Sequence, residues 1–490
     1  MSAQAAAAAA AASGFARLIA TPSSMGLRLT ATITNLGWDE AFDIITEFVE
    51  VAPSRRRLSL LDAGGNVRSH VKYFREAVAL LIELAMNGDT TAELLLLYLP
   101  RVLACKGISF EEALIAFEKR ERPITRAKSA DRMVVWARAV QASAEERPLK
   151  TMLERLDAMP TNASPPAQEP PLKERLEELH PVQPLGQEWA RWHARTTSVA
   201  TVSRFTSRDL LRWAHASANA AGGETGWTGH LVRHLNLPGH ELLDAFCAWA
   251  ARPPGRWAHT KNAAIATRAL TGWLIPRPGK SPRPIAAPSV IRRVGSRALV
   301  KRARSLAERF CVARGQLGLS GEAEAVAYTA LANTALRQGG QVACDDLSSS
   351  YTRFRREAVL DAVDALIATA TTDEDGDAVR AMCMAMADYY VADVAYDPAN
   401  PVTLPVSKVN FSELEDMLPI FGLAQGCTLS GLLESVTIAH HTPHGPKPHG
   451  PITLGNHDDL LRITGPHNPL LIDRTSRALG GCTQRPRRPR

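Results

Sequence analysis

The sequence predicts an α+β fold in which a helical N-terminal region precedes a mixed domain. From about residue 58 to residue 143, apolar residues recur at helical spacing. From Gly272 onward, short β-like runs at 273–275, 341–344 and 451–454 alternate with helical stretches at 297–313, 322–336 and 355–370. Such a mixture of strands and helices is typical of an α+β domain.

The composition is that of an ordinary globular protein with a mild positive charge. The 490 residues are 45% hydrophobic and 22% charged, and 57 basic against 50 acidic residues give a formal charge of +7. That charge permits nucleic acid as a partner without requiring it. Seven cysteines form no CxxC pair, which argues against a disulfide framework or a structural zinc site. The apolar run Leu94–Leu99 is far shorter than the roughly 20 residues that span a bilayer, so we expect a buried helix segment and no membrane partner.

Composition divides the chain into six segments. We expect an Ala-rich leader (1–40), a helical N-terminal region (41–158), a Pro-rich linker (159–186), a second helical region (187–271), the mixed domain (272–480) and a basic tail (481–490). The linker is assigned from seven prolines between Met159 and Gly186. Because the first 38 residues contain no acidic side chain, mitochondrial targeting is a weak alternative to a nuclear or cytoplasmic location.

Three helix starts are predicted from local signals. Thr206, with Asp209 three residues later, predicts a capped helix, and Gly226-Trp227-Thr228 predicts the start of the next helix. The acidic run from Asp373 resembles a calcium loop, but its glycine is misplaced. We therefore interpret this run as a charged helix start, where acidic groups suit the helix dipole.

Aspartates stand where apolar runs end in two distant segments. Residues 341–351 form an apolar strand that ends at Asp346 before a helix, and residues 452–463 place Asp458 and Asp459 between two apolar runs, as at the tip of a hairpin. Two-metal phosphoryl transfer needs carboxylates that converge from separate strands on ions about 3.5–4 Å apart. Magnesium prefers such oxygen ligands. A tandem aspartate alone is most often a solvated turn, so the neighbouring motifs decide the interpretation.

Two further segments provide a glycine-rich loop and a basic turn. Residues 421–433 contain Gly-Leu-Ala-Gln-Gly, with Gln425 and Gly426 leading into an apolar helix. Glycine there allows close backbone approach to a base or a phosphate. Upstream, a Pro- and Gly-rich turn contains Lys280 and Arg283, which are suited to bind a triphosphate.

The order of these motifs resembles that of reverse transcriptases. A basic turn, Asp-Leu-Ser-x-x-Tyr, Gly-Leu-x-Gln-Gly-x-x-x-Ser and x-x-Asp-Asp follow one another along the chain. The segments Gly318–Val326 and Gly222–Leu235 are similar to regions of polymerases from site-specific non-LTR retrotransposons. The resemblance covers roughly residues 200–480.

The resemblance implies a right-hand fingers-and-palm fold with an antiparallel sheet, and RNA-directed DNA polymerase activity. The implied partners are an RNA template, a DNA primer and deoxynucleoside triphosphates. The implied cofactor is Mg²⁺, held by Asp346 and Asp458 with Asp459 in support, whereas Asp345 is a neighbour without a ligand role.

The resemblance also implies residues that bind the incoming nucleotide. Tyr351 corresponds to the aromatic side chain that excludes a 2′-hydroxyl group. Gln425 and Gly426 correspond to the loop beside the nucleotide and the template. Lys280 and Arg283 correspond to the residues that bind the triphosphate.

The sequence departs from the family pattern at several positions. Ala424 and Gly431 stand where relatives carry proline, and Asn456-His457 replaces an aromatic-plus-small pair. Only 31 residues follow Asp459 and none is lysine, so we expect the lysine-bearing motif and the helical thumb to be missing. Two alternatives therefore stand beside an active enzyme: a catalytically inactive, truncated remnant that binds nucleic acid, and a helical protein-interaction scaffold.

Five histidines form a separate pattern near the C-terminal end of the mixed domain: His440, His441, His444, His449 and His457. Their spacing fits no zinc finger, and the prolines and glycines between them indicate a loop. We interpret them as loop residues rather than metal ligands.

Overall fold

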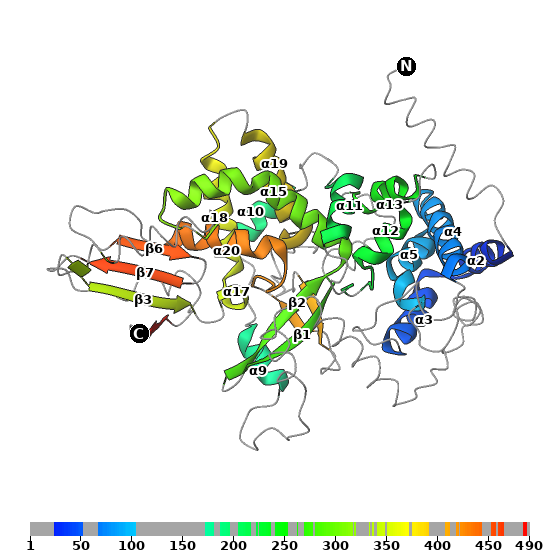
Figure 1. Cartoon of the computed structure of the whole chain (residues 1–490), viewed down its shortest axis with the longest axis horizontal. Coiled ribbons are helices and arrows are strands. Elements are labelled where there is room, and N and C mark those ends of the chain that lie inside the picture. Colours follow the sequence, from blue (N-terminus) through cyan, green and yellow to red (C-terminus); the bar gives the residue numbers. More distant parts are fainter. Residues whose placement is uncertain are drawn as a thin grey trace. The chain divides into compact units, whose positions relative to one another are not determined.

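The computed structural model describes helices, strands and turns over most of the central chain (Figure 1). The described residues are 24–51, 67–103, 172–180, 187–196, 204–216, 222–223, 225–236, 241–252, 262, 269–277, 280–316, 318–319, 333, 336–337, 341–347, 350–371, 375–391, 407–411, 418–420, 422–442, 452–456, 459–464 and 484–487.

The chain folds into two compact units, each assembled from separate stretches of sequence. Unit 1 contains Met1–Arg175, Ser217–Phe246 and Gly272–Ile285, and unit 2 contains Leu176–Ala216, Cys247–Thr271 and Ala286–Arg490. The chain passes between the units within the elements α9 (Leu172–Leu179), α13 (Leu242–Ala250), β1 (Ala269–Arg277) and β2 (Lys280–Pro288).

The described helices of unit 1 include a packed group from the N-terminal part of the chain. They are α2 (Ser24–Asn35), α3 (Trp38–Val51), α4 (Val67–Met86), α5 (Thr90–Leu103) and the later α12 (Gly229–Leu235). Helix α5 packs against α3 and α4. Every residue of Leu94–Leu99 is buried, which confirms the prediction of a buried helix segment there.

Trp227 is buried in the core of unit 1. Its ring centroid is 5.8 Å from that of Phe74 and 4.7 Å from that of Phe246. Its Nε1–H donates a hydrogen bond of 3.1 Å to the carbonyl oxygen of Leu96 on α5. A buried indole N–H needs such a partner, so Trp227 joins two segments that are distant in sequence by both packing and a hydrogen bond.

The described helices of unit 2 form its core. They are α10 (Gln187–Thr196), α11 (Ser207–Ala216), α15 (Val290–Val312), α17 (Ser350–Arg353), α18 (Arg356–Ala368), α19 (Asp375–Met386), the π-helical turn η2 (Ala387–Val391) and α20 (Thr428–His441). Helix α15 packs against α11, α19 and α20, and α18 packs against α10 and α20. Leu299, Leu360 and Leu433 from three of these helices are almost completely buried.

The three helix starts predicted from local signals are confirmed. The Thr206 hydroxyl accepts a hydrogen bond from the Asp209 N–H at 3.2 Å, and the Asp209 carboxylate accepts one from the Thr206 N–H, ahead of α11. The Thr228 hydroxyl accepts from the Leu231 N–H at the start of α12. Helix α19 begins at Asp375 with acidic residues in its first turn.

The described strands pair as short antiparallel ladders. Strands β6 (Ile452–Asn456), β7 (Asp459–Thr464), β3 (Gln341–Leu347) and β8 (Gln484–Arg487) lie side by side in that order, and β4 (Ser407–Phe411) pairs with β5 (Leu418–Ile420). Of these strands the structure describes the backbone and the register.

The prediction of an α+β fold with an antiparallel-sheet palm is wrong. The described part of the chain is mostly helical, and the packed core of unit 2, among the residues whose side chains the structure describes, consists of helices and contains no sheet palm. The physical reason is that α15, α18, α19 and α20 bury their apolar faces against one another, so helix packing supplies the core of unit 2. The short β-like runs are few, and the helical stretches between them are much longer, so the helices dominate the packing.

In the part of the chain that the structure describes, no helix is both long and apolar enough to cross a membrane.

Candidate functional site

Two of the predicted carboxylate positions lie opposite each other in the β3–β7 ladder. Asp346 of β3 and Asp459 of β7 are register partners, although they lie 113 positions apart in the sequence. Opposite positions in an antiparallel ladder have Cα atoms about 4.5–5.5 Å apart. Asp458 lies outside the described residues, directly before β7.

The neighbouring register pairs define where Asp346 and Asp459 lie in the ladder. Asp345 pairs with Leu460, so it is offset by one residue from the Asp346–Asp459 pair. Because successive strand positions alternate between the two faces, Asp345 and Asp346 occupy opposite faces of the ladder. On the other edge of β3, Arg485 of β8 is the register partner of Asp346.

The Gly-Leu-Ala-Gln-Gly loop lies directly against α17. A Cβ atom on Gly422 would be 2.3 Å from the carbonyl oxygen of Thr352, so only glycine allows this approach. The next residue, Leu423, donates its backbone N–H to the carbonyl oxygen of Tyr351 at 2.6 Å. Gly426 has φ of 113°, a conformation that favours glycine. The predicted loop is therefore fixed against the segment that contains Tyr351.

The same loop is bonded to the end of β2. The N–H of Ala286 donates to the carbonyl oxygen of Gln425 at 2.7 Å. Lys280 and Arg283 lie earlier in this strand, where the structure describes the backbone. Within unit 2, backbone hydrogen bonds thus join the loop at residues 422–427 to Tyr351 and to Ala286.

Behind the loop, Arg356 forms a buried contact that the motif analysis missed. It is 2% exposed, and its Nη2 donates to the carbonyl oxygen of Gly422 at 3.0 Å. Its guanidinium carbon lies 4.4 Å from the ring centroid of Tyr390, and the Tyr390 hydroxyl lies 3.3 Å from Ser430 Oγ. Burial lowers the pKa of Arg356 to about 10, against the raising effect of Tyr390. No local sequence pattern marks Arg356, because it contacts Gly422 only through the tertiary fold.

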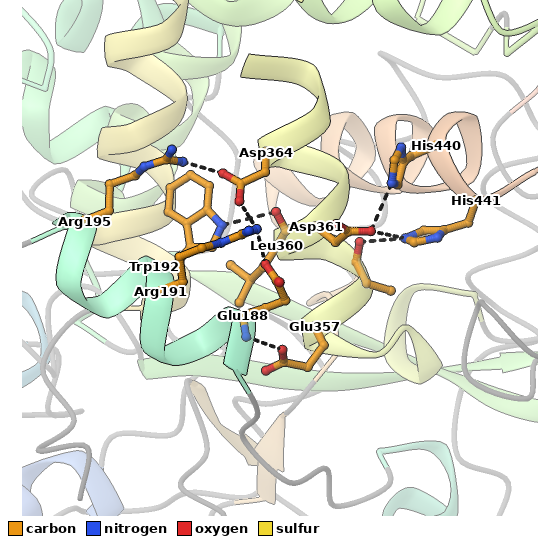
Figure 2. Close-up of polar contacts among 11 residues, drawn as sticks. Glu188, Arg191, Trp192, Arg195, Glu357, Leu360, Asp361, Asp364, His440 and His441 are labelled. Atoms are coloured by element: carbon orange, nitrogen blue, oxygen red, sulfur yellow. Dashed lines mark hydrogen bonds and ion pairs between the residues drawn. The ribbon is translucent and has the colours of Figure 1, made fainter. Parts of the chain in front are cut away.

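A second polar cluster joins α10, α18 and α20 (Figure 2). On one side of α18, Asp364 forms ion pairs with Arg191 and Arg195 of α10, and Trp192 Nε1 donates to the carbonyl oxygen of Leu360 at 3.2 Å. These contacts attach α10 to α18.

Asp361, on the other side of α18, faces two histidines at the end of α20 (Figure 2). His440 Nε2 lies 3.0 Å from Asp361 Oδ2, and His441 Nε2 lies 3.9 Å from the same oxygen. His441 Nε2 also lies 3.0 Å from the carbonyl oxygen of Ala358. Burial lowers the pKa of His441, and the hydrogen bond to Ala358 opposes that effect. The five-histidine pattern contains this pair, and His444, His449 and His457 lie outside the described residues.

Helix α15 presents two kinds of basic side chain. Arg302 and Arg309 form ion pairs with Asp377 and Asp375 of α19, and the hydrogen bond from Arg302 lowers the pKa of Asp377. A further set recurs at positions i, i+4 and i+7 and is exposed: Arg297, Lys301 and Arg304. Within the residues that the structure covers, none of these three forms an ion pair with an acidic side chain.

Comparison of the sequence with protein-family models gave no match, and comparison with curated proteins gave none either.

Proposed function

We propose that the chain is an RNA-directed DNA polymerase of a retrotransposable element. The observation that supports this most directly is the pairing of Asp346 with Asp459 across β3 and β7. Residues from two separate motifs thereby occupy opposite positions at a spacing that suits shared divalent ions. In this proposal Asp346 and Asp458 bind Mg²⁺, and Asp459 supports them. Magnesium bound there would stabilise the attacking and leaving oxygens of nucleotidyl transfer.

The nucleotide-binding roles in this proposal are supported by the bonds of the loop at residues 422–427. Tyr351 would select the sugar, and Gln425 and Gly426 would lie beside the nucleotide and the template. Backbone hydrogen bonds join this loop to Tyr351 and to Ala286 at the end of β2, all within unit 2. Lys280 and Arg283 would bind the triphosphate by charge-assisted hydrogen bonds.

The exposed basic set on α15 supports nucleic acid as the partner. Arg297, Lys301 and Arg304 stand on one stripe of the helix because residues three and four apart are neighbours on a helix surface. Phosphate contacts of this kind release counterions, so binding weakens as salt rises. The proposed partners are an RNA template and a DNA primer.

Primer extension on an RNA template, with Mg²⁺ and deoxynucleoside triphosphates, tests the polymerase proposal. We expect Asp346→Asn and Asp459→Asn to reduce extension by at least 100-fold, because each removes a carboxylate from the metal site. Asp345→Asn is the matched control, since it removes the adjacent carboxylate on the opposite face of β3. Equal losses in Asp345→Asn and Asp346→Asn would contradict the assignment.

A second candidate function, a catalytically inactive protein that binds nucleic acid, requires only the basic set on α15. Binding to primer–template at several salt concentrations tests it. Replacing Arg297, Lys301 and Arg304 with alanine should lower the salt-dependence slope by roughly 2 to 3. The control, Arg302→Ala with Arg309→Ala, removes arginines that acidic residues already neutralise and should change the slope little. Salt-dependent binding by a parent chain that extends no primer would establish this second function.

A further inference from the structure

Asp361, His440 and His441 bring three metal-binding side chains together from two packed helices. Asp361 lies in the middle of α18, and both histidines lie in the last turn of α20. One ligand atom from each of the three side chains lies within 4.8 Å of the others. Since α18 and α20 pack directly against each other, the helix cores fix the backbone positions of these residues.

The distances in this cluster suit a small tetrahedral ion. Zinc binds histidine nitrogen and carboxylate oxygen at about 2.0–2.2 Å, which requires neighbouring ligand atoms roughly 3.4 Å apart. The two nitrogen-to-oxygen distances, 3.0 Å and 3.9 Å, lie on either side of that value. A shift of about half an ångström would bring each of these two distances to that value. We propose that Asp361, His440 and His441 form a zinc site.

Partial exposure leaves one coordination position open to solvent. The side chains are 47% exposed for Asp361, 28% for His440 and 16% for His441. Three protein ligands with an accessible fourth position are the pattern of an open zinc site rather than a closed structural one. To bind the ion through Nε2, His441 gives up its contact with the carbonyl oxygen of Ala358.

A second histidine pair shows why the carboxylate matters. His230 and His234 stand one turn apart on α12, with their Nε2 atoms 3.2 Å apart. Two cations lie near this pair: Arg233 contacts His230 Nδ1 at 3.4 Å, and Arg75 donates to the His234 carbonyl oxygen. No carboxylate within the described residues completes a three-ligand cluster at this pair. Positive charge opposes a divalent cation there, whereas Asp361 attracts one.

The test measures zinc binding to the full chain by titration calorimetry and cobalt binding by visible absorption. The parent should bind one equivalent of Zn²⁺. The double variant with His440→Asn and His441→Asn should not bind this equivalent. Asp361→Asn should weaken the same equivalent by at least 10-fold. The matched control, His230→Asn with His234→Asn, should keep it. Cobalt in the parent should show the intense absorption of a tetrahedral site, and Asp361→Asn should reduce that absorption at the same cobalt concentration.

Two outcomes overturn the proposal. One is retention of the zinc equivalent with unchanged affinity in Asp361→Asn or in the His440/His441 double variant. The other is its loss in the His230/His234 control. Circular dichroism of each variant separates loss of the site from loss of the fold, and Asp361→Asn is the variant least expected to perturb folding because its side chain is the most exposed. The zinc site is independent of polymerase activity, so a chain that extends no primer still tests it.

Discussion

The core around Trp227 in unit 1 and the loop at residues 422–427 in unit 2 are stabilised in different ways. Trp227 packs against the rings of Phe74 and Phe246, and its indole donates one hydrogen bond to Leu96. The loop rests on backbone hydrogen bonds, a glycine in contact with Thr352 and the buried guanidinium of Arg356. Apolar burial is non-directional and tolerates small shifts, whereas the polar contacts of the loop specify one geometry. In this chain, therefore, the residues that stabilise the core of unit 1 differ in kind from those that fix the position of the loop in unit 2.

The largest expected effect is on the Trp227 core. Trp227→Ala should lower the free energy of unfolding of unit 1 by about 3–5 kcal/mol, because it removes a buried aromatic side chain and leaves a cavity. Trp227→Phe should cost less, since it keeps part of the ring volume and loses the bond to Leu96. Urea unfolding followed by circular dichroism measures both. Equal costs for the two variants would mean that the hydrogen bond, not apolar burial, dominates this core.

Acid should weaken unit 2 through His180. This side chain is 5% exposed, and burial lowers its pKa to about 4 from an ordinary value of 6.5. Between pH 6.5 and about pH 4, His180 is protonated in the unfolded chain but neutral in the folded chain. The stability that the buried neutral side chain contributes is therefore complete above pH 6.5 and falls as the pH drops through this range. The shift corresponds to roughly 3 kcal/mol.

His180→Leu tests this prediction by removing the titrating group. Thermal unfolding between pH 4 and pH 7 should show a shallower decline for His180→Leu than for the parent. His234→Gln is the comparison in unit 1, because burial also lowers the pKa of His234 to about 4. Its effect should be smaller, since His234 is more accessible to solvent. An unchanged pH profile for His180→Leu would contradict the assignment.

The smallest expected effect on stability is at the loop, but its effect on function should be large. Gly422→Ala places a Cβ atom 2.3 Å from the Thr352 carbonyl oxygen, so the loop must move. Such overpacking costs about 1–3 kcal/mol. Primer extension should fall more than tenfold while the melting temperature changes by a few degrees. Gly376→Ala is a control, because its nearest neighbour is the flexible end of Arg380 at 3.7 Å.

Local signals in the sequence were reliable where the structure depends on neighbouring residues. The capping residues Thr206 and Thr228 and the acidic start at Asp375 each begin a helix, as predicted. Capping works within one turn, so no distant contact is needed to specify it. The predicted fold class was wrong because a fold class depends on contacts between distant elements. In unit 2 the helices, and not the strands, supply the packed core.

The predicted site shows the same limit. Motif order pointed to Asp346, Tyr351, Gln425 and Asp459 as members of one site, and that assignment stays a prediction. The sequence did not indicate Arg356, which contacts Gly422 from 66 residues away, or the meeting of Asp361 with His440 across 79 residues. The prolines and glycines that follow the His440–His441 pair predict a loop, and for this pair that prediction is wrong, because both residues lie in the last turn of α20.

The sequence by itself determined where several helices begin, that Leu94–Leu99 is buried and which residues form the recognisable motifs. These depend on apolar spacing, capping and residue identity, all of which act over a few positions. Only the tertiary structure decided that helices form the core of unit 2, that Arg356 anchors the loop and that Asp361 faces two histidines. Such contacts arise because packing of whole helix faces selects which elements meet, and no short stretch of sequence encodes that selection.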